Sequence, residues 1–134
     1  MQSFVLSLHM LMVWIFLAAA GLALITAISL YFMTRNPTAD LEAGTIARFR
    51  RIFGILLSVT AGLGVLQALF GALLFLSGAR PEEGLHFVYG LIVLGAIPVA
   101  YVYSDQKQVR RDIIIMGIAV IAVIGAAIRA LATG

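Results

Sequence analysis

The chain has 134 residues, of which 63% are hydrophobic and only 11% are charged, and it contains no cysteine. Soluble domains carry about 25% charged residues, so the composition excludes a soluble domain, and the lack of cysteine excludes disulfides, iron–sulfur ligation and covalent haem attachment. The net charge is +3, and most of the basic residues lie in short connections between apolar runs. They therefore form no basic face on a soluble element, which argues against nucleic-acid binding.

Four continuously apolar runs predict four membrane-spanning helices, because each is at least as long as the roughly 18–20 residues that a membrane helix needs. Their expected bounds are about 4–33, 49–76, 83–103 and 110–132. Pro37 prevents the first helix from continuing, and Pro81 lies near the start of the third, where a missing N–H costs little. The runs lack the alternation of barrel strands. We therefore expect an all-α chain that forms one transmembrane domain over residues 1–134.

The lysines and arginines predict how these helices are oriented. Seven of the nine lie in the first and third connections: Arg35, Arg48, Arg50, Arg51, Lys107, Arg110 and Arg111. The other two, Arg80 and Arg129, lie on the opposite side. The positive-inside rule then predicts that, in a cell (inner) membrane, both termini lie on the side away from the cytoplasm. Short second and third connections favour an up-down-up-down four-helix bundle, in which the first and third helices lie diagonally across the core.

His9 and His86 are the two histidines of the chain, and each lies in a run almost free of ionisable groups. An ionisable side chain inside a membrane span is rare and marks a functional site by default. His9 lies about five residues into the first run and His86 about three into the third, so both are within one or two helical turns of the outer interface. Two inward-facing imidazoles at one level of a bundle can bind one haem iron. We predict both histidines as metal ligands.

A second alignment of the same runs argues against this pairing. Counted from Tyr31 and Tyr101 near the inner ends, His9 is 22 residues away and His86 is 15 residues away. The difference of seven residues is about 10 Å along a helix, which is too far for one iron. The outer-end alignment is favoured because Pro81 and the start of the first run fix it. The relative heights of the first and third helices decide between the two.

Small residues near the histidines are candidates to contact a haem. Gly64, Gln67 and Gly71 share one face of the second helix and would form a flat groove with one polar member. Gly90 follows His86 by four residues, on the same helical face, and would leave space for the edge of a porphyrin. Plain helix packing would also explain such a glycine face.

Two polar side chains near the outer end are further candidates for cofactor binding. Arg129 could pair with the haem propionates, because its planar guanidinium suits carboxylates. Tyr89, three residues after His86, could donate a hydrogen bond to a propionate or an imidazole. The alternative for Arg129 is that it extends to the lipid headgroups.

With His9, His86 and Gly90 placed on four spans, the chain resembles the small four-helix membrane b-type cytochromes. The resemblance implies one b-type haem (haem b) near the outer face and one-electron transfer between a membrane quinol, or a partner reductase, and an acceptor on the outer side. It implies an electron-transfer protein more than a catalyst. The protein would hold the haem and tune it, while the redox chemistry belongs to the cofactor.

Other functions remain open at this point. A haem carrier or sensor would use the same residues, and a cofactor-free accessory or assembly subunit of a larger membrane complex would explain the dense small residues and short loops. A transporter is disfavoured because no acidic residue or lysine lies deep in a span, and a structural zinc site would need about four ligands. Besides the lipid bilayer, the expected partners are a membrane redox partner or quinol; the sequence also leaves a homo-oligomer open.

Overall fold

The computed structural model describes residues 2–35, 44–104 and 108–134. The described part is all-helical with four helices, as predicted: α1 (Gln2–Met33), α2 (Gly44–Leu76), α3 (Leu85–Tyr103) and α4 (Val109–Thr133). Pro37, at the predicted end of the first helix, and Lys107, one of the seven basic residues on the predicted inner side, lie outside the described residues.

The start of α2 is the largest difference from the predicted bounds. The helix begins at Gly44, five residues before the predicted start near residue 49. An apolar run reports the stretch that fits the hydrocarbon layer, whereas arginines such as Arg48 and Arg50 are good helix formers and extend the helix beyond that stretch. Pro98 lies inside α3, which nevertheless continues from Leu85 to Tyr103. Membrane helices tolerate proline because neighbouring groups can satisfy the freed carbonyl.

The end of α2 is a Schellman motif built on a glycine. Gly78 has a φ of 92°, a conformation that side chains with a Cβ rarely adopt. Its N–H donates to the carbonyl of Phe75 at 3.1 Å, and the N–H of Ala79 donates to the carbonyl of Leu74 at 3.0 Å. This pattern satisfies the last carbonyls of the helix and turns the chain toward α3.

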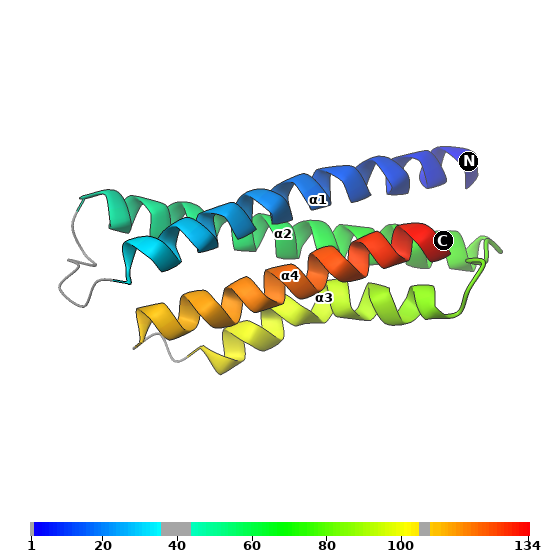
Figure 1. The fold of residues 1–134 in the computed structure, drawn as a ribbon. Coiled ribbons are helices and arrows are strands. Elements are labelled where there is room, and N and C mark those ends of the chain that lie inside the picture. The colour runs from blue at the N-terminus through cyan, green and yellow to red at the C-terminus, as the bar shows by residue number, and fades with distance from the viewer. Residues whose placement is uncertain (1, 36–43, 105–107) are drawn as a thin grey trace.

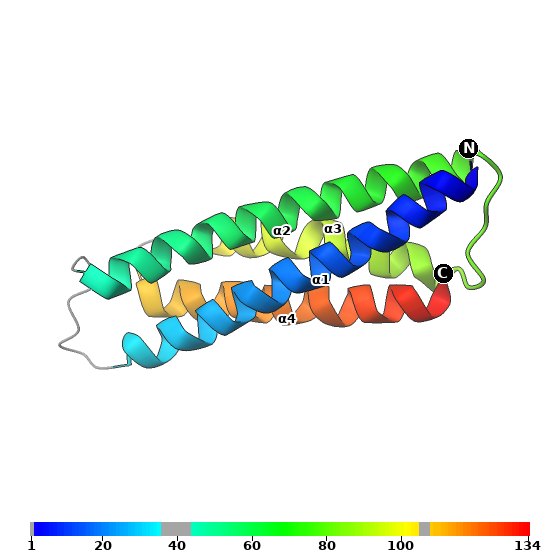
Figure 2. The same ribbon diagram turned by 90° about the horizontal axis from the view of Figure 1, so that it is seen from above.

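The four helices lie side by side, with α1 and α3 running in one direction and α2 and α4 in the other (Figures 1 and 2). Each of α1 and α3 packs against both α2 and α4, while within the described ranges no Cα atoms of α1 and α3, or of α2 and α4, approach within 8 Å of each other. The helices α1 and α3 therefore lie diagonally across the core. We call the end formed by the starts of α1 and α3 and the ends of α2 and α4 the histidine end, and the opposite end the arginine end.

Small residues let α1 and α4 approach closely in the core. Ala20 and Ala23 of α1 are fully buried, and a Cβ at Gly117 of α4 would lie 3.7 Å from the Cβ of Ala27. Close helix approach through alanine and glycine is typical of membrane bundles, where packing rather than water exclusion drives association.

The outer surface of the bundle is suited to lipid. All four helices are long and apolar enough to cross a membrane. Large apolar side chains point outward along their length, among them Phe4, Trp14, Leu76 and Val102, the last being 82% exposed. An apolar surface of this extent is not tolerated in water by soluble monomers. These features are those of a multi-pass membrane protein.

Candidate functional site

One contact fixes the relative heights of three helices. A Cβ at Gly64 of α2 would lie 3.2 Å from the carbonyl oxygen of Val93 on α3 and 3.7 Å from Cε2 of Phe16 on α1. Phe16 and Val93 are both buried, at 1% and 9% exposed. Phe16, Gly64 and Val93 therefore lie at one level of the core, and we call this set the Phe16 layer.

Both histidines are related to this layer by the same step. His9 precedes Phe16 by seven residues and His86 precedes Val93 by seven residues, on helices that run in the same direction. Seven residues make nearly two full turns and about 10.5 Å of rise, so each histidine lies on the inward face of its helix, about two turns from the Phe16 layer. The two histidines consequently share one level toward the histidine end, which agrees with the outer-end alignment of the sequence.

A second contact supports the same level. Gly71 follows the glycine of the Phe16 layer by seven residues on the antiparallel helix α2, and a Cβ there would lie 3.8 Å from Cε1 of His9. His9 and Gly71 thus lie at one level, and the equal seven-residue step from the Phe16 layer places His86 at that level on α3.

The ring of His86 is fixed against α4. Its Nδ1 lies 3.1 Å from the carbonyl oxygen of Ala130, and a Cβ at Gly134 would lie 2.8 Å from its Cε1. A carbonyl oxygen can only accept a hydrogen bond, so Nδ1 carries the proton and Nε2 of the neutral ring holds the lone pair. Metal-binding histidines characteristically have this arrangement, with one ring nitrogen bound to a carbonyl or carboxylate and the other free to ligate.

The ring of His9 is packed against α2 and lacks such a partner. Nδ1 of His9 is buried and accepts or donates no hydrogen bond within the described ranges. Gln67, which is 8% exposed, donates from Nε2 to the backbone carbonyl of His9 at 3.2 Å, while its Oε1 is buried and also without a partner there. Buried polar atoms without a partner cost about 1–3 kcal/mol each. The core around His9 therefore has hydrogen-bonding or ligating capacity that the fold leaves unused.

The predicted glycine face of α2 points into the core, but its members differ in surroundings. Gly64 and Gln67 are buried and Gly71 is half-buried. At Gly64 the space is filled by Phe16 and the backbone of α3, so this glycine contributes close packing. At Gly71 the neighbour is the His9 ring, so this glycine borders the candidate site.

The remaining predicted residues lie on α3 and α4 at the histidine end. Gly90 is exposed, and a Cβ there would meet no atom within 4 Å, so it opens onto the outer surface of the bundle. The guanidinium of Arg129 lies 5.9 Å from the centroid of the Tyr89 ring. These two side chains contact each other across α3 and α4, near His86 and Ala130 in sequence, with Arg129 exposed at the surface.

Sequence reasoning missed the backbone partner at this site. Ala130 contributes its backbone carbonyl, and no pattern of side chains in the sequence reveals such a group. Ala130 follows the fully buried Val123 by seven residues, and this spacing could have placed it on the inward face of α4. In the part of the chain that the structure describes, no three histidine, cysteine or acidic side chains gather around one point, so the candidate donors are the two histidines.

No protein-family model, no curated protein and no solved structure matches this chain.

Proposed function

We propose that the protein is a membrane-embedded b-type haem protein that transfers single electrons, in which the imidazoles of His9 and His86 would together hold one haem. The observation that carries the proposal is their shared level on the diagonal helices α1 and α3, set by the Phe16 layer. Two histidine ligands leave no open position on the iron for oxygen, which favours electron transfer over oxygen activation.

The residues at the histidine end fit such a group in two respects. The hydrogen bond from Nδ1 of His86 to Ala130 leaves Nε2 free to ligate. Nδ1 of His9 is buried without a partner in the same part of the core, and ligation through this atom would relieve its cost. When bound, haem supplies a one-electron couple, and the apolar core keeps its surroundings dry.

Several further residues have proposed roles in holding the group. Gly71 leaves room beside the His9 ring, while Tyr89 and Arg129 would bind the propionates from the α3–α4 side. Gln67 would fix the backbone of α1 at the ligand. The structure gives Gly64 a packing role in the Phe16 layer and places Gly90 outside the core, so neither has a direct contact in this proposal.

The membrane setting of the proposal follows the charge distribution. An up-down-up-down bundle in a cell (inner) membrane, with both termini outside the cytoplasm, places the histidine end at the outer face, because the arginine end carries most of the basic residues. Electrons would then pass from a membrane quinol or a partner reductase to an acceptor on the outer side. The resemblance to small four-helix membrane b-type cytochromes supports the same assignment.

The absorption spectrum of the detergent-purified protein tests this function. A sharp Soret band, with split visible bands after reduction by dithionite, is expected for low-spin b-type haem. His9→Ala and His86→Asn should each abolish this spectrum. The asparagine amide can still donate to the Ala130 carbonyl, so a folded, colourless His86→Asn variant separates ligation from a purely structural role. Helix content by circular dichroism is the folding control.

The alternatives predict different results in the same experiment. A cofactor-free accessory or assembly subunit would show no low-spin b-type spectrum, either as purified or after hemin is added and the unbound hemin is removed. It would also be unaffected by His9→Ala. A haem carrier or sensor would give the expected spectrum but would release its haem to apomyoglobin within the time of the assay, whereas an electron-transfer protein would retain it through oxidation and reduction.

A further inference from the structure

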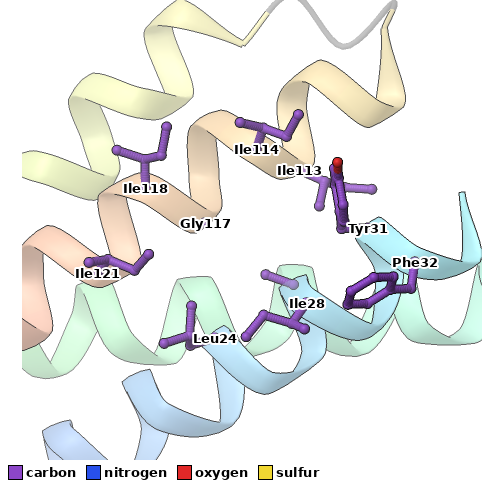
Figure 3. A pocket seen from close by; sticks show the side chains of 10 residues that line it. Leu24, Ile28, Tyr31, Phe32, Ile113, Ile114, Gly117, Ile118 and Ile121 are labelled. Carbon is purple, nitrogen blue, oxygen red and sulfur yellow. The ribbon is translucent and has the colours of Figure 1, made fainter. Parts of the chain in front are cut away.

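An apolar groove lies between α1 and α4 toward the arginine end (Figure 3). It has a volume of about 280 Å³. Its walls are aliphatic and aromatic side chains from the two helices, chiefly Leu24, Ile28, Tyr31, Ile114, Ile118 and Ile121. Gly117 also lines it, where a Cβ would lie 3.7 Å from the Cβ of Ala27 on α1.

The groove opens onto the lipid-facing surface. Ile118 and Ile121 on one rim are 62% and 57% exposed, and Phe32 on the other is 62% exposed. All of its lining side chains are apolar except the hydroxyl of Tyr31. An occupant must therefore present a hydrocarbon chain to the groove and must come from the membrane side.

A cation is held at the end of the groove. Arg110 donates from Nη2 to the hydroxyl oxygen of Tyr31 at 3.3 Å, and its guanidinium lies 5.2 Å from the centroid of the same ring. Arg110 is exposed, and no carboxylate within the described ranges pairs with it. Because the Tyr31 oxygen accepts from Arg110, the hydroxyl proton stays free to donate to a ligand. The polar end of the groove thus offers a positive charge and at least one further donor.

We propose that this groove binds one phospholipid with an anionic headgroup. The headgroup phosphate lies against Arg110 and Tyr31, and an acyl chain follows the groove toward Leu24 and Ile121. The guanidinium fork matches phosphate oxygens, and basic pockets between membrane helices on the cytoplasmic side are known to bind anionic headgroups. A zwitterionic lipid would fill the groove equally well but would gain less from the cation. The proposal rests on α1 and α4 alone and is independent of haem binding.

Competition between two phospholipids tests the proposal. The protein is mixed in detergent micelles with equal amounts of phosphatidylglycerol and phosphatidylcholine that have the same acyl chains. It is then released from the micelles, and the bound lipids are identified by native mass spectrometry. We expect one phosphatidylglycerol to bind preferentially to the wild-type protein. Arg110→Gln removes a charge-assisted contact and should reduce this apparent affinity roughly tenfold.

Arg80 provides the matched control. It is also an exposed arginine stacked on an aromatic ring, 4.0 Å from the centroid of Phe75, but it lies at the histidine end. Arg80→Gln should leave the preference unchanged. Tyr31→Phe keeps the ring beneath Arg110 and removes only the hydroxyl, so it should weaken binding several-fold and serves if Arg110→Gln does not fold.

The groove itself is tested by filling it. Ile118→Trp on the rim should reduce binding of both lipids, whereas Ile128→Trp, at a similarly exposed position outside the groove, should not. Equal binding of the two lipids to the wild-type protein, or equal losses in Arg110→Gln and Arg80→Gln, would show an unselective lipid surface and overturn the proposal.

Discussion

The Phe16 layer places both histidines at one level, so a substitution at its glycine is the most direct test of the site. Gly64→Leu adds a side chain at a position where Cβ alone would lie 3.2 Å from the carbonyl oxygen of Val93. The atoms beyond Cβ would meet Phe16, which is 1% exposed and packed within the hydrophobic core. The helices α2 and α3 must then separate.

The size of the effect follows from a comparison with Gly62→Leu. A Cβ at Gly62 would meet no atom within 4 Å, and the residue is exposed on the same helix. Both substitutions gain the same helix propensity, up to about 1 kcal/mol, so this gain cancels between them. The difference is the cost of overpacking, about 1–3 kcal/mol. We therefore expect Gly64→Leu to be less stable than Gly62→Leu by about 1–3 kcal/mol.

The free energy of unfolding can be measured in detergent micelles by following the helical circular dichroism signal while a denaturing detergent is added. Equal stability of the two variants would mean that Gly64 is not at a close helix contact. The common level of His9 and His86 would then lose its structural basis, and with it the main support for a shared ligand.

Three further predictions concern other features of the fold. Gln67→Leu removes both a hydrogen bond to the His9 carbonyl and an unpartnered acceptor, and these two effects on stability oppose each other. In thermal unfolding, the haem-free variant should therefore have a stability within about 1 kcal/mol of the wild type. A loss of several kcal/mol would contradict this balance. Gly78→Ala forces a residue with a Cβ into the left-handed region and should lower the free energy of unfolding by about 1–2 kcal/mol. Gly84→Ala, at a φ of −60°, should not lower it. Equal melting temperatures of the two variants would disprove backbone strain at position 78. Trp14, the single tryptophan, is 62% exposed on the outer surface and should be quenched by lipids brominated in their acyl chains; quenching by aqueous acrylamide instead would argue against its lipid exposure.

The helices could be predicted from the sequence because continuous apolar runs are a strong signal for membrane-length segments. The first residues of the helices were harder to predict. The helix α2, for example, begins at Gly44, in a polar stretch that hydropathy does not mark as part of the span. Arg48 and Arg50 fix the orientation in the sequence interpretation, yet in the structure they simply continue the helix. Composition thus locates the hydrocarbon layer better than it locates helix ends.

The level of the histidines could not be decided from the sequence. The two alignments, from the outer or the inner ends, differ by seven residues, and the chain has 13 glycines, several of which could mark a close contact. Gly62 and Gly64 look alike in the sequence, but only Gly64 meets other helices. Helix crossing depends on which glycine faces a neighbour, and this is a property of the assembled bundle.

A structural role alone explains His86 but not His9. Ala130 lies in the last turn of α4, where backbone carbonyls lack partners in a following turn, so the Nδ1–H of His86 can be understood as a cap on that helix. No comparable partner exists for the buried Nδ1 of His9 within the described ranges, and a buried polar atom left in this way costs about 1–3 kcal/mol. Gln67 adds a second unpartnered atom in the same part of the core. The haem proposed above would give Nδ1 of His9 a partner by ligation, while the cap that fixes His86 leaves its Nε2 free to ligate.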